Sequence, residues 1–488
     1  MRGWAAPRIA AASGATLLAA GDAAAGPSAV AIDSRAIEGG ELFVGLRGER
    51  TDGGQHAAAA LRAGAWGALI APAHADDAAA AAAEVGAVLL SHPDPLAALQ
   101  GLAAAWRAEL VADGARVIAI TGSTGKTSTK DILAALLSTQ VPTWATPANL
   151  NTEIGLPLAI LAAPAGVRCL VLEMAMRGPG QIAELTAIAD PDVGVILNVG
   201  PAHLELLGSL EAIAAAKAEL IAGLAPGRTA VLPAREPLLA PHVRSDLHTV
   251  TFGEDGEVTL QEVLPDGRVR IRRGAETVEL APSFEEAHNL RNLLAAVAAA
   301  GAVGVTPHGE LRVVFSAGRG GRLELAGGVV LIDDCYNANP MSMAAALEDL
   351  ARRAPARSVA VLGDMLELGP SGGELHRQLG VRAGASGVDL LIAVGPLAAL
   401  TADTFAGESH RVGDAAAAAE LLPALLHDGD TVLVKASRGV GLEVVVERLC
   451  ADTEADTAGP TAGVAVAEQD ARADEAAALV PGAPRGRR

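Results

Sequence analysis

Cysteine, tyrosine and lysine are all scarce in this chain of 488 residues, which has three cysteines, one tyrosine and four lysines. Cys169, Cys335 and Cys450 are odd in number and show no paired spacing, so the sequence predicts neither a disulfide framework nor a cysteine-based zinc site. This cysteine usage is typical of a reducing cytoplasm. At roughly 150 residues per domain, the length predicts about three domains.

Positively charged residues are also scarce. The chain has 37 lysines and arginines against 57 aspartates and glutamates, which gives a net charge of −20. That charge repels nucleic acid and anionic lipid as bulk partners, so any phosphate must be bound locally. The apolar run from Ile9 to Ala20 is too short to span a bilayer, which needs about 20 residues, and we expect no membrane insertion. A secretion signal is one interpretation of this run, and a surface helix of the first domain is the favoured one.

Short apolar runs alternate with alanine-rich helical stretches, a pattern that predicts an α/β protein with parallel sheets. We place the domains at residues 1–109, 110–310 and 311–450. Turn residues between short runs predict an antiparallel insertion at residues 250–280.

The last predicted helix ends near Cys450. Residues 451–488 lack aromatics and periodicity, so this predicted tail is expected to be disordered.

The four lysines, Lys126, Lys130, Lys217 and Lys435, stand against 33 arginines. Arginine does not give up its proton in a protein, whereas a partly buried lysine can become a neutral, nucleophilic amine. We therefore expect some of these lysines to occupy positions where arginine would fail. Chance among rare residues is the alternative explanation.

A phosphate-binding loop is predicted at Thr121-Gly122-Ser123-Thr124-Gly125-Lys126-Thr127-Ser128, between a predicted strand and a predicted helix. Free backbone N–H groups and the positive end of the helix dipole attract phosphate there. The two glycines let the backbone approach the anion. Lys126 is expected to neutralise the charge of the phosphate, and the Thr127 hydroxyl is expected to bind Mg²⁺. Ile120 stands where the common form of this loop has its first glycine, so the loop is a shorter variant.

This loop resembles that of the Mur ligases and their folylpolyglutamate synthetase relatives. Further segments occur in the order of that family: Asn149 to Pro157, Glu173-Met174, Ala202 to Glu205, Lys217 to Glu219, His288 to Asn292, Gly318-Arg319, Asp333 to Pro340, Leu362 to Gly369 and Lys435 to Arg438. The resemblance covers about residues 1 to 450. Tyr336 to Pro340 and Gly363 to Gly369 are its most specific segments, and they are most similar to the branch that adds D-alanyl-D-alanine.

The resemblance implies a small α/β nucleotide-sugar domain, a central P-loop parallel-sheet ATPase domain and a Rossmann-like C-terminal α/β domain. It implies an ATP-dependent ligase that joins UDP-N-acetylmuramoyl-tripeptide (UDP-MurNAc-tripeptide) to D-Ala-D-Ala through an acyl phosphate, in cytoplasmic peptidoglycan precursor synthesis. We expect a monomer. A P-loop ATPase acting as a switch, and a catalytically dead relative, are alternatives. A sister ligase for a diamino acid is disfavoured, because its Asp-Asn-Pro-Arg segment is absent here.

The resemblance also implies a site with two Mg²⁺ ions. Their expected ligands are Thr127, Glu173, His203 and Lys217, the last as a carbamate formed with CO2. From the residues alone, Glu173 is also typical of a helix cap, His203 of a structural histidine and Lys217 of a solvated helix residue. Lys126 and Arg319 complete the set expected to be catalytic.

The remaining assignments implied by the resemblance concern binding. Nucleotide contacts are expected from the loop residues Gly122, Ser123, Thr124, Gly125 and Ser128, and from His288, Asn289, Asn292, Arg319, Asp334 and Tyr336. Substrate contacts are expected from Ser34, Arg35, Asn149, Asn151, Lys435 and Arg438. Because Arg319 and Tyr336 belong to a different predicted domain than the loop, the third domain is expected to close over ATP.

The chain departs from the family pattern at a few positions. Cys335 replaces the usual serine before the tyrosine, Thr152 replaces the usual second asparagine of the substrate loop, and His56 stands farther from Asp52 than usual. The last departure bears on how the nucleotide sugar is held.

Overall fold

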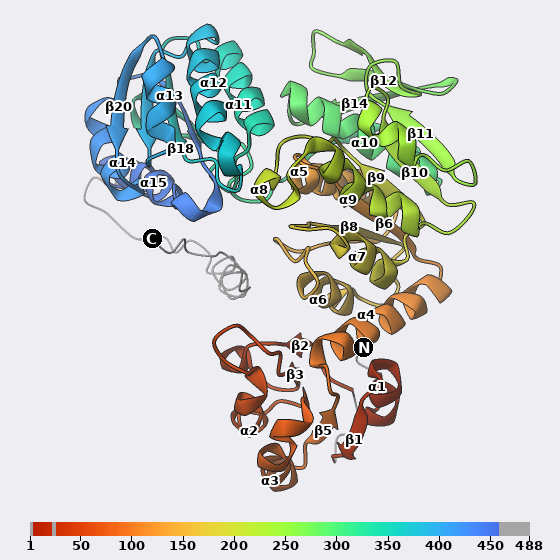
Figure 1. The fold of residues 1–488 in the computed structure, drawn as a ribbon. Helices are drawn as coiled ribbons and strands as arrows, with labels where there is room; N and C mark the ends of the chain where they lie inside the picture. The colour runs from red at the N-terminus through yellow and green to blue at the C-terminus, as the bar shows by residue number, and fades with distance from the viewer. Residues whose placement is uncertain (1–2, 22–25, 458–488) are drawn as a thin grey trace.

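The chain folds into three α/β units in a computed structural model that describes residues 3–21 and 26–457 (Figure 1). Each unit is built on its own sheet, with strand orders β1-β5-β4-β3-β2, β15-β14-β13-β12-β11-β10-β9-β6-β8-β7 and β16-β17-β21-β18-β19-β20. The predicted α/β class with three domains is thus confirmed.

The first sheet is parallel except for β1, which pairs antiparallel with β5. Its elements are α1 (Ala6–Ser13), β1 (Thr16–Ala19), β2 (Val30–Ala31), β3 (Leu42–Val44), α2 (Ala57–Arg62), β4 (Gly67–Ile70), α3 (Ala75–Val85) and β5 (Val88–Ser91). The surface helix expected over Ile9 to Ala20 is therefore only partly correct. The helix ends before Gly14, which takes a left-handed conformation with φ +68°, and the rest of the run forms β1.

Helix α4 (Pro95–Ala112) connects the first unit to the second, with the Asp94 side chain capping its first N–H groups. It packs against α1 on one side and against α6 and α7 of the central unit on the other (Figure 1). The boundary predicted at residue 109 falls inside this helix.

The central sheet has ten strands, and the run from β7 through β12 is parallel. Its strands are β6 (Arg116–Thr121), β7 (Thr143–Ala145), β8 (Cys169–Glu173), β9 (Val193–Ile196), β10 (Thr229–Pro233), β11 (His248–Phe252), β12 (Val258–Val263), β13 (Val269–Arg273), β14 (Glu276–Pro282) and β15 (Gly309–Leu311). The antiparallel insertion expected at 250–280 is narrower than predicted, because β11 pairs in parallel with β10 and only β12 to β14 are antiparallel.

Helices cover both faces of this sheet: α5 (Lys126–Ser138), α6 (Gly155–Ala162), α7 (Gln181–Ala189), α8 (Leu204–Leu207), α9 (Leu210–Gly223) and α10 (Ala287–Ala302). Strand β6 shows why. Ile118 and Ile120 pack into one core cluster, whereas Val117 and Ala119 pack into the other. A strand buried on both faces is expected to read as a continuous apolar run, and this one does.

The third sheet is parallel except for its edge strand β16. Its strands are β16 (Gly321–Glu324), β17 (Val330–Asp333), β18 (Ser358–Gly363), β19 (Leu390–Val394), β20 (Glu408–Val412) and β21 (Thr431–Lys435). Its helices are α11 (Pro340–Arg353), α12 (Gly372–Ala385), α13 (Ala398–Thr404), α14 (Ala415–Leu421) and α15 (Glu443–Thr457).

Helix α15 corrects the sequence prediction at its end, since it continues to Thr457 instead of ending near Cys450. The predicted tail therefore begins inside a helix, and its residues 458–488 lie outside the described part of the chain. The boundary predicted at residue 310 falls within β15. Within residues 3–21 and 26–457, every helix is too short or too polar to cross a bilayer.

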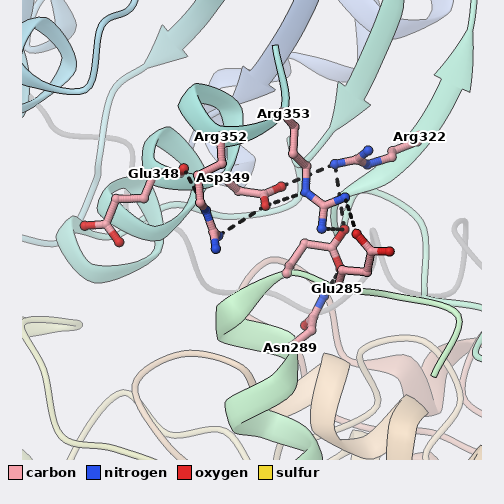
Figure 2. A network of polar contacts seen from close by, with 8 residues as sticks. Glu285, Asn289, Arg322, Glu348, Asp349, Arg352 and Arg353 are labelled. Atoms are coloured by element: carbon pink, nitrogen blue, oxygen red, sulfur yellow. Dashed lines mark hydrogen bonds and ion pairs between the residues drawn. The ribbon is translucent and has the colours of Figure 1, made fainter. Parts of the chain in front are cut away.

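A network of charged side chains joins the central and C-terminal units (Figure 2). Asp349 of α11 accepts a hydrogen bond from Arg353 Nε at 2.8 Å and pairs with Arg322 at 3.5 Å. Both arginines reach Glu286, which precedes α10, at 3.4 and 3.8 Å, and Arg353 also approaches Glu285 at 3.6 Å. Burial alone would raise the pKa of Glu286, but its own backbone N–H and the charge of Arg353 hold it below the usual value.

We predict that Glu286→Gln loosens the junction between these two units, because the amide keeps the shape of the side chain but removes its charge. The ion pairs of Glu286 with Arg322 and Arg353 are partly buried, so the free energy of unfolding in urea denaturation should fall by more than the about 1 kcal/mol typical of an exposed pair. The matched control is Glu348→Gln in the exposed Glu348–Arg382 pair, where about 1 kcal/mol or less is expected. Equal losses in the two variants would contradict the prediction.

His376 of α12 supports the segment Gly363 to Gly369 from a fully buried position. Its Nε2 accepts a hydrogen bond from Met365 N at 2.9 Å, and its Nδ1 donates to Gly372 O at 2.6 Å. Burial lowers the pKa of His376, although its backbone bond and the charge of Asp364 act against that shift. The neutral ring is therefore the form that fits this site.

We predict that His376 makes the protein less stable in mild acid. The unfolded histidine takes up a proton near pH 6.5, whereas the folded one does so only at lower pH, so the free energy of unfolding falls as pH drops below about 6.5. Urea denaturation at pH 7.5 and 5.5 should show a smaller loss in His376→Gln than in the wild type. The exposed His248→Gln variant should keep the wild-type loss, and a wild-type loss in His376→Gln would refute the assignment.

Candidate active site

A cleft of about 640 Å³ lies where the central and C-terminal units meet. It brings together most of the residues selected from the sequence: Ser123, Thr124, Gly125, Lys126, Thr127, Ser128, Asn149, Asn151, Glu173, His203, His288, Asn289, Asn292, Arg319, Asp334, Tyr336, Lys435 and Arg438. Of the other selected residues, Gly122 and Lys217 are buried beside the cleft and do not line it, and Ser34 and Arg35 lie in the first unit.

The predicted phosphate loop runs from β6 into α5, as the sequence indicates. Gly125 has φ +80°, and a Cβ at this position would lie 2.7 Å from the Asn292 amide oxygen, so only glycine fits. Asn198 accepts a hydrogen bond from Thr124 N at 3.0 Å and donates one to Thr124 O at 3.1 Å. The side chain of Lys126 folds back on the loop, donating to Gly122 O at 2.8 Å. The loop is thus held in shape by the protein itself.

Opposite charges flank Lys126. Burial within the cleft lowers the pKa of Lys126, the carboxylate of Glu173 raises it, and the guanidinium of Arg319 lowers it again. Because Glu173 belongs to the central unit and Arg319 to the C-terminal unit, the two units together set the electrostatics at the loop.

Glu173 ends β8 with a carboxylate that is only half satisfied. Its backbone N–H donates to the Thr146 hydroxyl at 3.0 Å, and its Oε1 accepts from the Asn151 amide at 2.7 Å. Its Oε2 is buried without a hydrogen-bond partner, and the residue is 1% exposed. A buried oxygen of this kind requires a partner, and a hard cation such as Mg²⁺ fits it.

His203 is held by a residue that the sequence analysis did not select. Its Nδ1 is hydrogen-bonded to Glu367 of the C-terminal unit, and Glu205 N donates to the Glu367 carbonyl at 3.1 Å. The bond from His203 keeps the pKa of the Glu367 carboxyl below its usual value. Within the described ranges, no three His, Cys, Asp or Glu side chains lie close enough to hold a metal ion together. A cation here would also need hydroxyl, phosphate or modified-lysine oxygens.

Lys217 is 1% exposed on α9, among the small residues Ala214, Ala216 and Ala218. Burial lowers the pKa of Lys217 well below its usual value, and the charge of Lys126 lowers it further. Both effects favour the neutral amine, which is the nucleophilic form. The solvated helix lysine considered from the sequence is therefore excluded.

The residues expected to bind the nucleotide base lie in the first turns of α10. Asn292 donates to Asn289 at 3.3 Å, and Asn289 donates to Glu286 at 3.3 Å, so the asparagines are aligned on one face. Burial lowers the pKa of the neighbouring His288. This arrangement offers amide and imidazole groups next to the phosphate loop.

Tyr336 faces this region from the C-terminal unit. The guanidinium carbons of Arg319 and Arg438 lie 4.1 and 5.3 Å from the centre of its ring, both within cation–π range. Burial raises the pKa of the Tyr336 hydroxyl. Two cations therefore approach the cleft beside one aromatic ring.

Lys435 is tied to Asp334, another selected residue. Its Nζ donates to Asp334 Oδ2 at 2.7 Å and to Asn337 O at 2.9 Å, and the lysine is 2% exposed. The pair fixes the turn that presents Asp334 to the cleft. Contact of Lys435 with the dipeptide stays a prediction.

Ser34 and Arg35 form a short 3-10 turn whose side chains lie away from the cleft. Asp33 accepts hydrogen bonds from the Arg35 backbone at 3.0 Å and from its guanidinium at 2.7 Å, and the side-chain bond lowers the pKa of Asp33. Uridine diphosphate binding at this turn stays a prediction.

Several residues of the cleft were not selected from the sequence, and three of them make contacts that hold the site together: Asn198, Asn339 and Glu367. Asn339, at the start of α11, donates to Ser123 O at 3.3 Å and so links the C-terminal unit to the phosphate loop. A signal existed for Asn198, because it follows β9, and ligands gather at the carboxyl ends of neighbouring parallel strands.

Comparisons with known proteins agree with this geometry. Three family models match in order: the Mur ligase family catalytic domain over residues 28–107, the Mur ligase middle domain over 120–300, and the Mur ligase glutamate ligase domain over 318–438. A UDP-N-acetylmuramoyl-tripeptide–D-alanyl-D-alanine ligase of Bacillus subtilis is 37% identical over 86% of this chain and 92% of its own length.

Solved structures give the same result. MurF from Acinetobacter baumannii superimposes with a TM-score of 0.80 at 29% identity, covering 91% of this chain and 98% of its own. The MurF ligase from Thermotoga maritima in complex with ADP has a TM-score of 0.74 at 32% identity, covering 88% of this chain and 98% of its own. The chain therefore belongs to the Mur ligase family and, within it, to the MurF group.

Proposed function

We propose that this chain is the ATP-dependent ligase that joins D-alanyl-D-alanine to UDP-N-acetylmuramoyl-tripeptide. The observation that carries the proposal is the cleft in which the phosphate loop, the half-satisfied Glu173 and the C-terminal Arg319 converge. The substrates are taken from two relatives that are named UDP-N-acetylmuramoyl-tripeptide–D-alanyl-D-alanine ligase and match 86% and 87% of this chain.

The reaction must bring two anions together, because the substrate carboxylate attacks the γ-phosphate of ATP. Repulsion between them is the main obstacle, so the site needs cations aimed at the transferring group. Lys126 on the loop and Arg319 from the C-terminal unit supply two of these. The acyl phosphate and ADP form first, and the amine of D-Ala-D-Ala then displaces phosphate to give the amide.

Two Mg²⁺ ions would supply the remaining positive charge when bound. Thr127 and Glu173 would hold one of these ions, since Glu173 Oε2 is buried and has no hydrogen-bond partner. We assign the second ion to His203 and to Lys217 as its CO2 carbamate. The lowered pKa of Lys217 supports this assignment, because only a neutral amine adds CO2.

The setting of the reaction is also part of the proposal. Cys169 and Cys335 are buried and unpaired, which fits the reducing cytoplasm where a nucleotide-linked precursor is made for cell wall growth and division. A monomer suffices, since all the groups named above come from one chain.

We predict that ADP release requires both substrates. A coupled ADP assay should show turnover with ATP, Mg²⁺, UDP-MurNAc-tripeptide and D-Ala-D-Ala, and little without either substrate. The carboxylate takes the γ-phosphoryl group of ATP, and the amine must then displace phosphate from the acyl phosphate before the enzyme can turn over again. The assay is run with lysine and with diaminopimelate as the third residue of the peptide. Lys126→Met is the inactive control.

A P-loop ATPase acting as a switch gives the opposite result. It would release ADP at the same rate with and without the nucleotide tripeptide, and that outcome would reject the ligase assignment.

We predict that Lys217→Arg lowers turnover by about 100-fold or more while the protein stays folded, a loss typical of removing a group that stabilises charge in an active site. Arginine stays protonated and cannot form the carbamate. Turnover and circular dichroism are measured together. In addition, ¹³C NMR with labelled bicarbonate should show a carbamate carbon in the wild type and none in Lys217→Arg; identical spectra would refute the modification.

A further inference from the structure

Lys130 is the one lysine of the four that has no part in phosphate binding, metal binding or substrate contact. It lies on α5, one turn after Lys126, and is 3% exposed. Its Nζ donates to Thr146 O at 3.0 Å and pairs with Asp131 Oδ1 at 3.1 Å. Neither Lys130 nor Asp131 lines the cleft. A buried ion pair is costly to desolvate, so its presence next to the phosphate loop calls for an explanation.

The lysine supports the residues behind Glu173. Thr146 directly follows β7, and its hydroxyl accepts the backbone N–H of Glu173 at 3.0 Å. The loop after Thr146 carries Asn151, which donates to Glu173 Oε1 at 2.7 Å. By fixing the Thr146 carbonyl, Lys130 holds both contacts of Glu173 in place.

The aspartate holds the connection to the C-terminal unit. Asp131 Oδ2 accepts two hydrogen bonds from Ser316, one from its backbone N at 2.9 Å and one from its hydroxyl at 3.0 Å. Ser316 lies in the segment between β15 and β16, three residues before Arg319. Asp131 thus fixes the chain just before Arg319, which stacks on Tyr336 and lines the cleft together with Lys126.

We propose that Lys130 and Asp131 are positioning residues that hold Glu173 and Arg319, which line the same cleft as Lys126, in place beside the phosphate loop. One side of the pair acts through Thr146 and the other through Ser316. This inference rests on the proposed ligase function. It assigns no contact with substrate or nucleotide to either residue.

The pair also explains why lysine is kept here in a chain rich in arginine. A lysine ammonium directs its donors tetrahedrally, so one atom serves both the Thr146 carbonyl and the Asp131 carboxylate. A planar guanidinium spreads its donors over separate nitrogens in a fixed plane, so it could not serve both partners from one atom.

The chain contains a matched control for the Asp131–Ser316 contact. At the start of β18, Asp389 Oδ2 accepts from Ser358 N at 2.8 Å and from Ser358 Oγ at 2.9 Å. The geometry is the same, but Ser358 begins β18 and Asp389 directly precedes β19, so this contact adjoins neither Arg319 nor the phosphate loop. Loss of a serine hydroxyl hydrogen bond can therefore be compared between the Asp131–Ser316 contact and the Asp389–Ser358 contact.

The test is a double-mutant cycle between Ser316→Ala and Arg319→Ala, because coupled residues give non-additive losses. The readouts are the Kd for ADP with Mg²⁺ by calorimetry and kcat in the ligase assay. Ser316→Ala alone should weaken ADP binding and lower kcat by about 5- to 10-fold, which is about the value of one ordinary hydrogen bond. With Arg319 already replaced, it should change either quantity by less than about 2-fold.

Ser358→Ala should leave both readouts unchanged, alone or combined with Arg319→Ala. Additive losses for Ser316→Ala, or an equal loss for Ser358→Ala, would overturn the proposal. Asp131→Ala should weaken ADP binding and lower kcat more than Ser316→Ala does, and it should show the same coupling to Arg319→Ala. If Asp131→Ala does not fold, the test rests on Ser316→Ala. ADP binding is independent of the peptide substrates, so a wild type that binds ADP but lacks ligase turnover would reject the proposed function and leave this cycle readable.

Discussion

The charge balance around Lys126 is the interaction on which the rest of the site depends. Burial disfavours its ammonium, Glu173 favours it, and Arg319 opposes it from another unit of the fold. Charges removed from water interact more strongly than exposed ones, so small displacements of either neighbour change the field that a bound phosphate meets. Both neighbours are held in place. Glu173 ends a strand of the central sheet, and the segment before Arg319 is hydrogen-bonded to Asp131 through Ser316.

The parts of the fold that could be predicted from sequence are those with a local cause. Strand β8 is an example, because its five residues, Cys169 to Glu173, form one buried and mainly apolar run. Strands β1, β16 and β20 have no such continuous buried run. They lie at sheet edges and mix polar with apolar residues, so they become strands through pairing, as when Arg322 stands opposite Ile332. No local pattern encodes such a partner.

The same distinction holds in the site. The phosphate loop could be predicted because its glycines, lysine and threonine are adjacent in the chain. The His203–Glu367 bond joins residues 164 positions apart, and the Lys435–Asp334 pair joins residues 101 apart. Resemblance supplied the identity of three of these four residues, but not that they pair with one another. Such contacts depend on how strands and units are arranged in space, which motifs do not describe.

The scarcity of lysine acquires a physical meaning in the structure. Lys130, Lys217 and Lys435 are at most 3% exposed, and Lys126 lies at the cleft. Arginines serve the surface, where a planar group can pair with a neighbouring carboxylate, as Arg244 does with Asp246 at 2.6 Å. A narrow buried position instead favours a single nitrogen on a flexible stem. In this chain the surface cations are arginines. The four lysines are therefore found in the cleft or at buried positions close to it, where charges interact most strongly.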